Sequence, residues 1–175
     1  MRPTSALLLT LAFAASAAAA AEPATTTTLY ALTDTGVGDP IGSITFKNGK
    51  SGLLLLTKLA GLPPGAHGIH LHQNADCSAL AKDGQTVPGL AAGGHFDPAK
   101  AGKHLGPTGD GHKGDLPVLK VAANGTAHER LVAPHLTLAD ISGHAVIIHA
   151  GGDNYSDEPK PLGGGGARIA CGVVQ

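Results

Sequence analysis

Six of the ten histidines in this chain of 175 residues are placed where they could act as metal ligands. His70 and His72 lie two residues apart in an apolar segment, so on a β-strand their side chains would leave the same face. Their imidazoles could reach one ion if one ring offers its near nitrogen and the other its far nitrogen. Taken alone, the pair is equally compatible with surface histidines that bind metal only adventitiously.

A second group of candidate ligands follows along the sequence. His95, His104 and His112 are followed by Asp115, and His149 ends a later apolar segment. Six imidazoles and one carboxylate are seven groups, whereas two four-coordinate metals need eight bonds. One imidazole that binds both metals through its two nitrogens would supply the eighth. Imidazole suits zinc, copper, iron and nickel, and a copper centre of the cysteine and methionine type is excluded because the only methionine is the first residue.

The composition predicts that β-strands position these side chains. The chain contains 26 glycines and 12 prolines, the weakest helix formers. Short segments of β-type residues recur between turn signals such as Asn48-Gly49 and Asn124-Gly125. The expected strands are residues 26–33, 41–46, 53–59, 67–72, 116–122, 126–132, 145–150 and 168–174. Eight strands with at most one helical turn, at 137–141, predict an all-β fold, an eight-stranded Greek-key barrel or sandwich.

Two long loops interrupt this pattern, at residues 73–115 and 151–167. Loops of this length in a compact domain are usually functional or disordered. These two contain a cysteine, three histidines and several aspartates, so a disulfide and a metal could hold them in place. Their composition therefore favours a functional role.

The first 21 residues predict a signal peptide. Arg2 supplies the positive start, an apolar run follows, and Ala19 and Ala21 fit the small-residue rule for cleavage. The run is shorter than the roughly 20 strongly apolar residues that a membrane span needs. We therefore expect export, removal of residues 1–21, no membrane span in the mature chain, and one domain over residues 22–175.

Cys77 and Cys171 are the only cysteines. No Cys-x-x-Cys pair occurs, which excludes a thiolate zinc knuckle and a thioredoxin-like motif. In an exported chain two cysteines most simply form one disulfide, with two separate buried thiols as the alternative. The formal net charge of −1 does not suggest nucleic-acid binding.

Six motifs stand in order along the chain: Gly-Ala-His-Gly-Ile-His-Leu-His at 65–72, Gly-His-Phe-Asp-Pro at 94–98, His-Leu-Gly-Pro at 104–107, His-Lys-Gly-Asp-Leu-Pro at 112–117, His-Ala-Gly-Gly-Asp-Asn at 149–154 and Gly-Ala-Arg-Ile-Ala-Cys-Gly-Val at 166–173. Through them essentially the whole mature chain resembles the copper/zinc superoxide dismutases, most closely the bacterial periplasmic type. The resemblance implies a periplasmic enzyme that converts superoxide to oxygen and hydrogen peroxide while its copper is alternately reduced and reoxidised, and so protects the cell envelope from superoxide.

The resemblance also implies a role for each motif residue. The copper ligands would be His70, His72, His95 and His149, and the zinc ligands His95, His104, His112 and Asp115. His95 would bridge the two metals and supply a proton during turnover. Asp153 would join a copper-ligand histidine to a zinc-ligand histidine, and Arg168 would guide the superoxide anion, with Lys82 as a weaker second candidate.

Two positions depart from the family pattern. Ile69 stands where phenylalanine is more usual, a packing change that leaves the ligands in place. Lys120 stands where dimeric bacterial members tend to have an apolar contact residue, so homodimer and monomer are both compatible with the sequence.

Two other functions use the same residues. One is a non-catalytic periplasmic carrier of copper or zinc, and the other is an inert secreted module with incidental histidines. Asp153 and Arg168 favour the enzyme, because metal storage needs neither a residue that joins the two sites nor an anion guide. The four remaining histidines are interpreted as structural or exposed: His67, His128, His135 and His144.

Overall fold

The computed structural model describes residues 23–175, and the predicted signal peptide lies outside them. Its strands are β1 (Ala24–Thr33), β2 (Gly36–Gly49), β3 (Gly52–Leu59), β4 (Gly65–His67), β5 (Ile69–His72), β6 (Leu80–Lys82), β7 (Gln85–Val87), β8 (Leu119–Val121), β9 (Arg130–Ala133), β10 (His144–His149) and β11 (Arg168–Val174). One α-helical turn, α1 (Leu138–Ile141), and two 3-10 turns, η1 (Leu90–Ala92) and η2 (Leu162–Gly164), complete the described elements.

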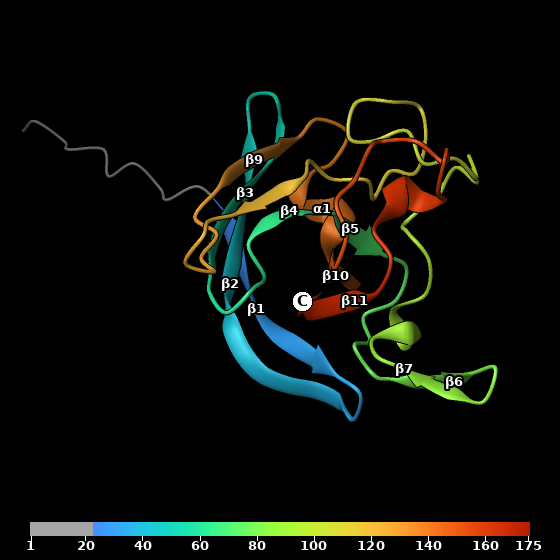
Figure 1. Cartoon of the computed structure of the whole chain (residues 1–175). Helices are drawn as coiled ribbons and strands as arrows, with labels where there is room; N and C mark the ends of the chain where they lie inside the picture. Colours follow the sequence, from blue (N-terminus) through green and yellow to red (C-terminus); the bar gives the residue numbers. More distant parts are fainter. Residues whose placement is uncertain (1–22) are drawn as a thin grey trace, which may run out of the picture.

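Seven strands form one antiparallel sheet in the order β5-β10-β11-β1-β2-β3-β9. Strands β4 and β8 form a separate two-stranded sheet, which lies next to the larger one along the chain because only Gly68 separates β4 from β5. The larger sheet curls round on itself (Figure 1). The all-β barrel predicted from the sequence is therefore confirmed, with a strand in each of the eight expected segments.

The structure corrects two details of the prediction. The strand expected at 67–72 is broken at Gly68 into β4 and β5. The long loop contains a short hairpin, β6–β7, which projects from the barrel in Figure 1. Each of its strands has only three residues and five of the six are exposed, so they give no alternating pattern to recognise.

The helical turn predicted at 137–141 is confirmed as α1, with Thr137 and Asp140 forming a capping box.

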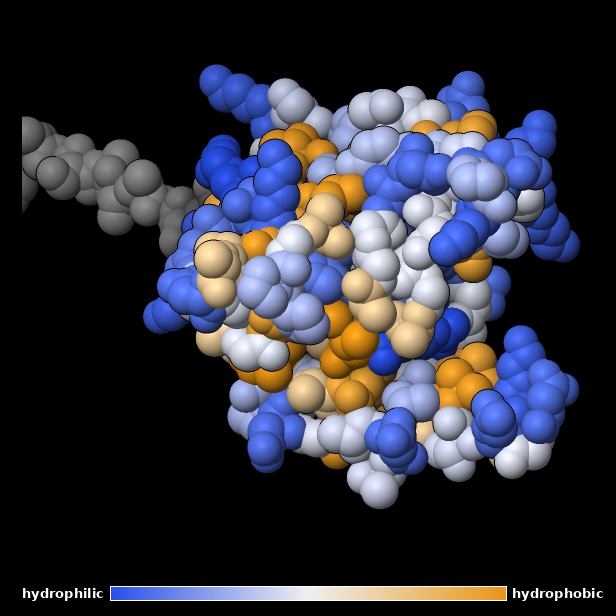
Figure 2. All heavy atoms as spheres, in the orientation of Figure 1, coloured by the Kyte–Doolittle hydropathy of each residue, from blue (hydrophilic) through white to orange (hydrophobic). Residues whose placement is uncertain are grey.

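The apolar side chains that point into the barrel form its core. Leu29, Ile44, Leu55, Val146 and Ile148 are completely buried and come from different parts of the sheet. Hydrophilic residues cover most of the rim of the face seen in Figure 2, and hydrophobic atoms appear mainly in its middle. Because these side chains are excluded from water and closely packed, the barrel is a rigid support for the side chains on its strands.

The long loop from β5 to β8 is attached to the edge of the barrel in two places. Strand β5 pairs with β10 on one side, and on its other side Leu71 exchanges backbone hydrogen bonds with the loop, donating to Gly114 at 2.9 Å and accepting from Phe96 at 2.8 Å. The disulfide between Cys77 and Cys171, predicted from the cysteine count, ties the same loop to β11.

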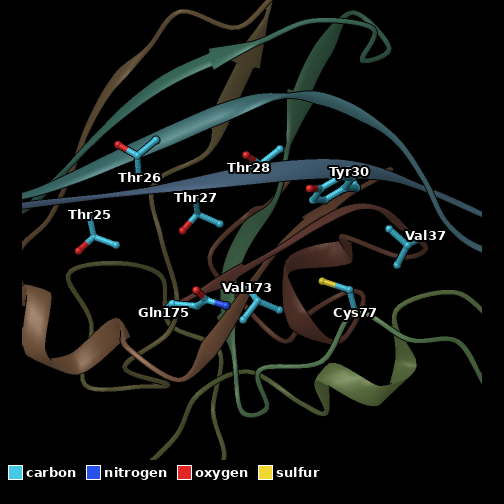
Figure 3. A pocket seen from close by; sticks show the side chains of 9 residues that line it. All are labelled: Thr25, Thr26, Thr27, Thr28, Tyr30, Val37, Cys77, Val173 and Gln175. Carbon is cyan, nitrogen blue, oxygen red and sulfur yellow. The ribbon is translucent and has the colours of Figure 1, made fainter.

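A groove of about 420 Å³ runs along the outer face of β1 and β11 (Figure 3). Thr25 and Thr27 point toward Gln175 and Val173 in this view, with Tyr30 further along β1. The groove is lined mainly by threonine and apolar side chains and contains none of the histidines. Within residues 23–175 there is no helix of the length and apolarity that crossing a membrane requires.

Candidate metal centre

The seven side chains predicted to bind metal converge on one place in the fold. Ligand atoms within 4.8 Å of one another define three groups in the described residues. Two of them contain all seven side chains, and we call these the copper group (His70, His72, His95 and His149) and the zinc group (His95, His104, His112 and Asp115). The third consists of Asp153 with one histidine from each of these groups, His70 and His104. His95 belongs to both the copper group and the zinc group, an arrangement that the count of ligand groups permits. The two groups therefore lie side by side and share one imidazole, whose ring stacks on that of His70 at a centroid distance of 4.0 Å.

Three members of the copper group come from barrel strands. His70 and His72 lie on β5 and His149 ends β10, the strand paired with β5. Nδ1 of His72 donates to the carbonyl of Gly93 at 2.9 Å, and Nδ1 of His149 donates to that of Gly166 at 3.1 Å. These bonds leave Nε2 as the lone-pair nitrogen of both rings, and the two Nε2 atoms lie 3.4 Å apart.

The zinc group comes entirely from the long loop. Nδ1 of His95 lies 2.9 Å from Oδ1 of Asp115, and Nδ1 of His104 lies 3.0 Å from Oδ2 of the same carboxylate. Nδ1 of His112 is 3.4 Å from Asp115 Oδ1. The three Nδ1 atoms and the carboxylate thus face one another, which is the donor set of a closed tetrahedral zinc site.

Unpartnered nitrogen atoms show that these groups fit metal ions. In the described chain, buried ring nitrogens of His70, His95, His104 and His112 lack a hydrogen-bond partner. Nδ1 of His104 is close to Asp115 but is not aligned for a hydrogen bond. Buried polar atoms are normally paired. Nitrogens that approach a shared centre without bonding to each other are the pattern that ligands of a common ion leave, so the residues fit copper and zinc.

Burial keeps the copper group neutral. It lowers the pKa of His149 to about 3 and the pKa of His95 to about 4, with neighbouring imidazoles adding to the shift. Burial likewise holds the pKa of His72 well below its ordinary value. A neutral imidazole offers one lone-pair nitrogen, so His72 and His149 need not lose a proton before binding a metal at neutral pH. His95 would give up its remaining ring proton to bind both metals, and two nearby dications would lower the pKa of that proton.

In the zinc group, contacts with carboxylates outweigh burial in setting the pKa of a histidine, His104. Burial alone would lower the pKa of His104, but its close contacts with the carboxylates of Asp115 and Asp153 raise it to about 9. The same contacts hold the pKa of both carboxyl groups below their usual range, although burial opposes this. Zinc would therefore displace a proton from His104 when it binds.

Asp153 connects the two groups from outside. Its Oδ2 is 2.8 Å from Nε2 of His70 and its Oδ1 is 2.7 Å from Nε2 of His104. Each ring uses its other nitrogen, Nδ1, to face its own group. Asp153 thereby orients one histidine of each group, as second-layer carboxylates do in metal sites.

Arg168 lies at the start of β11, next to the copper group. Its Nη1 donates to the carbonyl of Gly89, and its Nη2 donates to that of Gly93 at 2.6 Å. The Gly93 carbonyl is also the acceptor for His72, so one oxygen connects the guanidinium with a member of the copper group. Arg168 is half-buried, and burial lowers its pKa, but a guanidinium remains charged in proteins.

Residues 41–174 match the family model described as copper/zinc superoxide dismutase. The chain belongs to the copper/zinc superoxide dismutase family. It is 55% identical over 145 residues to the Cu-Zn superoxide dismutase of Photobacterium leiognathi, covering 82% of this chain and 84% of the relative. The solved Cu/Zn superoxide dismutase from Brucella abortus superposes with a TM-score of 0.86 at 49% identity, covering 87% of this chain and all of the other. The monomeric copper, zinc superoxide dismutase from Salmonella enterica gives 0.79 at 49% identity, with the same coverage.

Sequence reasoning did not find several contacts that position the site. The carbonyls of Gly89, Gly93 and Gly166 fix Arg168 and two histidines, and a backbone oxygen gives no signal in a list of side chains. His67 is buried, with its two ring nitrogens 2.8 Å from the carbonyl oxygens of Pro63 and His149, in keeping with the structural role predicted for it. His128 and His135 are exposed, as expected, and His144 bonds to backbone carbonyls of residues 72 and 73.

Proposed function

We propose that this chain is a superoxide dismutase that binds copper in the copper group and zinc in the zinc group, with His95 shared between them. The observation that carries the proposal is the pair of buried ligand groups meeting at one imidazole, with an arginine fixed beside the copper group. A metal carrier needs no such arginine. The family membership supports the same activity.

Bound copper supplies a reversible one-electron exchange, by which one superoxide is oxidised to oxygen and a second, with two protons, is reduced to hydrogen peroxide. The protein contributes the surroundings of this exchange. Arg168 presents a fixed positive charge that raises the local concentration of the superoxide anion. His95 can hold a proton at Nε2, the nitrogen that faces the copper group, and release it to the reduced substrate.

Zinc is redox-inert, and in the zinc group all four positions would be filled by protein ligands. Its proposed role is to hold Nδ1 of His95 and to keep the long loop closed. Asp153 keeps the rings of His70 and His104 in fixed orientations, so that neither turns away when His95 changes its protonation.

The proposed place of action is the periplasm. The signal peptide predicted at residues 1–21 supports this location, and so does the Cys77–Cys171 disulfide, because disulfides persist in oxidising compartments.

The decisive experiment measures metal content and superoxide decay on the same purified protein loaded with copper and zinc. We expect one copper and one zinc per chain and rapid dismutation. His149→Ala should lose copper and activity together while zinc remains bound. A loaded wild-type protein that binds both metals but leaves superoxide to decay at its spontaneous rate would instead identify a carrier.

A further inference from the structure

The loop from β10 to β11 reaches the zinc-group loop through three alternate residues, and the middle one has no role in the proposed function. Asp153 bonds to the ring of His104, and Asp157 accepts a hydrogen bond from the His104 backbone amide at 2.8 Å. Tyr155 stands between them. In Figure 1 the two loops, yellow and orange to red, lie together on one side of the barrel.

Tyr155 contacts the chain at two points, shortly after His104 and shortly after Asp115. Its hydroxyl accepts a hydrogen bond from the amide of Val118 at 2.9 Å, three residues after Asp115. Its ring packs on Gly106, two residues after His104, so closely that a β-carbon on that glycine would lie 2.6 Å from the ring. A single side chain therefore spans from Gly106 to Val118, two points of the chain between which His112 and Asp115 lie.

The backbone of Tyr155 is held in place for this contact. Its φ of 59° is a left-handed conformation that residues with a side chain seldom adopt, and such a conformation persists only where the surroundings enforce it. Its amide donates to Oδ1 of Asp153 at 2.8 Å, the oxygen that also contacts His104. The tyrosine and the carboxylate that orients His104 are thus parts of one hydrogen-bonded unit.

We propose that Tyr155 is a positioning residue for zinc: its ring and hydroxyl hold Gly106 and Val118 at the spacing at which His104, His112 and Asp115 converge. The inference rests on the zinc group of the proposed function. Coupling between two sites is reciprocal, so whatever factor the Tyr155 contacts add to zinc affinity, bound zinc adds to the stability of those contacts.

The chain offers a matched control for this residue. Tyr30 and Tyr155 are the only tyrosines, and both side chains are 38% exposed, but Tyr30 lies on β1 in the groove of Figure 3. Zinc affinity is measured by competition with a chelator on metal-free protein. We expect Tyr155→Ala to weaken zinc binding by roughly ten- to a hundredfold, as loss of an outer partner of a metal ligand does. Tyr155→Phe keeps the ring, so its zinc affinity should fall only by roughly three- to tenfold. The zinc affinity of Tyr30→Ala should match that of the wild type.

Fluorescence tests the reciprocal effect, which a residue needed only for folding would not show. The chain has no tryptophan, so in Tyr30→Phe the only tyrosine emission comes from Tyr155. Adding zinc to this metal-free variant should protect the emission from quenching by acrylamide. Tyr155→Phe, which reports Tyr30 alone, should show no protection.

The outcomes separate this inference from the function on which it rests. Zinc affinity of Tyr155→Ala equal to that of Tyr30→Ala, or an absence of zinc protection in Tyr30→Phe, would overturn the role of Tyr155. Asp115→Ala serves as the reference for the zinc group itself. If that variant binds zinc as the wild type does, the ligand assignment fails rather than the positioning residue.

Discussion

The copper group and the zinc group are built from different parts of the molecule although they share a histidine. Three of the copper-group histidines lie on β5 and β10, two buried and paired strands of the barrel. All four zinc-group residues lie between residues 95 and 115, in a segment where the only short-range regularity is a set of turns and single backbone bridges. One group is therefore fixed by the barrel core. The other lies on a loop whose two ends bridge to β5 through the backbone and whose middle is held by side-chain contacts with the neighbouring loop.

This difference predicts how each group responds to damage. Hydrogen bonds of β5 and β10 are protected by the core, so local opening there should be rare, whereas loops open at low cost. Loss of zinc should loosen the loop without disturbing the strands. Loss of copper should leave both regions folded. The copper group is thus expected to survive changes that remove the zinc group.

Substitution of a single ligand residue tests whether the two groups are independent most directly, and it has the largest expected effect. Asp115→Ala should weaken zinc binding by more than about a hundredfold, beyond the loss typical of an outer partner, because it removes one of four ligands and the carboxylate that faces the three imidazoles. Copper should stay bound, since His70, His72 and His149 remain on their strands. Metal content and chelator competition measure both.

The matched control for Asp115→Ala is His149→Ala, which should lose copper and retain zinc. Hydrogen exchange should then show faster exchange of amides 95–115 in the Asp115 variant only. Simultaneous loss of both metals in both variants would show that the two groups form a single unit, contrary to the comparison.

The disulfide has the next largest effect and acts on the side of the long loop nearest the copper group. Free-thiol titration of denatured, unreduced protein should find almost none, and two reactive thiols per chain would contradict the bond. The bond closes a sequence separation of 94 residues. Replacement of both cysteines by serine should lower the free energy of unfolding by about 2–4 kcal/mol, measured with denaturant. Zinc content should be unaffected, because the zinc group begins beyond η1.

The two regions also differ in how far the sequence predicts them. The barrel strands could be located because turn signals separate β-type segments, and His70 and His72 could be paired because side chains alternate along a strand. The loop residues gave no geometric signal of their own. His104 and Asp115 were assigned through resemblance to a family, since nothing in local periodicity brings residues eleven positions apart to 3.0 Å. Tyr155 and the glycine carbonyls remained unseen because tertiary contacts alone give them a role.

Charge reversal at Arg168 probes the copper side without touching a ligand. Arg168→Glu should lower kcat/KM for superoxide by roughly ten- to a hundredfold with unchanged copper and zinc, because the field that attracts the anion is inverted. Added salt should slow the wild type by screening and should have a weaker or opposite effect on the variant. Superoxide decay followed over a range of ionic strength gives both quantities.

Arg168→Lys separates attraction from positioning at the same residue. Lysine keeps the positive charge but cannot bond to the Gly89 and Gly93 carbonyls as a planar fork does. Its salt dependence should therefore resemble the wild type, with a smaller loss of kcat/KM than in Arg168→Glu. Equal rates and equal salt slopes in the wild type and Arg168→Glu would exclude a guiding role.

The smallest expected effect concerns the ion pair that ties the zinc-group loop to the barrel. Nζ of Lys113, between His112 and Asp115, lies 2.6 Å from Oδ1 of Asp140 on α1, and their side chains are 33% and 25% exposed. Ion pairs this exposed contribute about 0.2–1 kcal/mol to the stability of the contact they make. Lys113→Met should therefore weaken zinc binding by at most about fivefold, and by less in high salt.

Asp140→Asn should cost more than Lys113→Met, because the carboxylate also accepts hydrogen bonds from the amide and hydroxyl of Thr137 at the start of α1. A double-mutant cycle on zinc affinity isolates the pair from this helix cap. A coupling near zero would mean that Lys113 does not hold the loop. A loss of copper as large as that of zinc would show that loop and barrel are less independent than the placement of their ligands indicates.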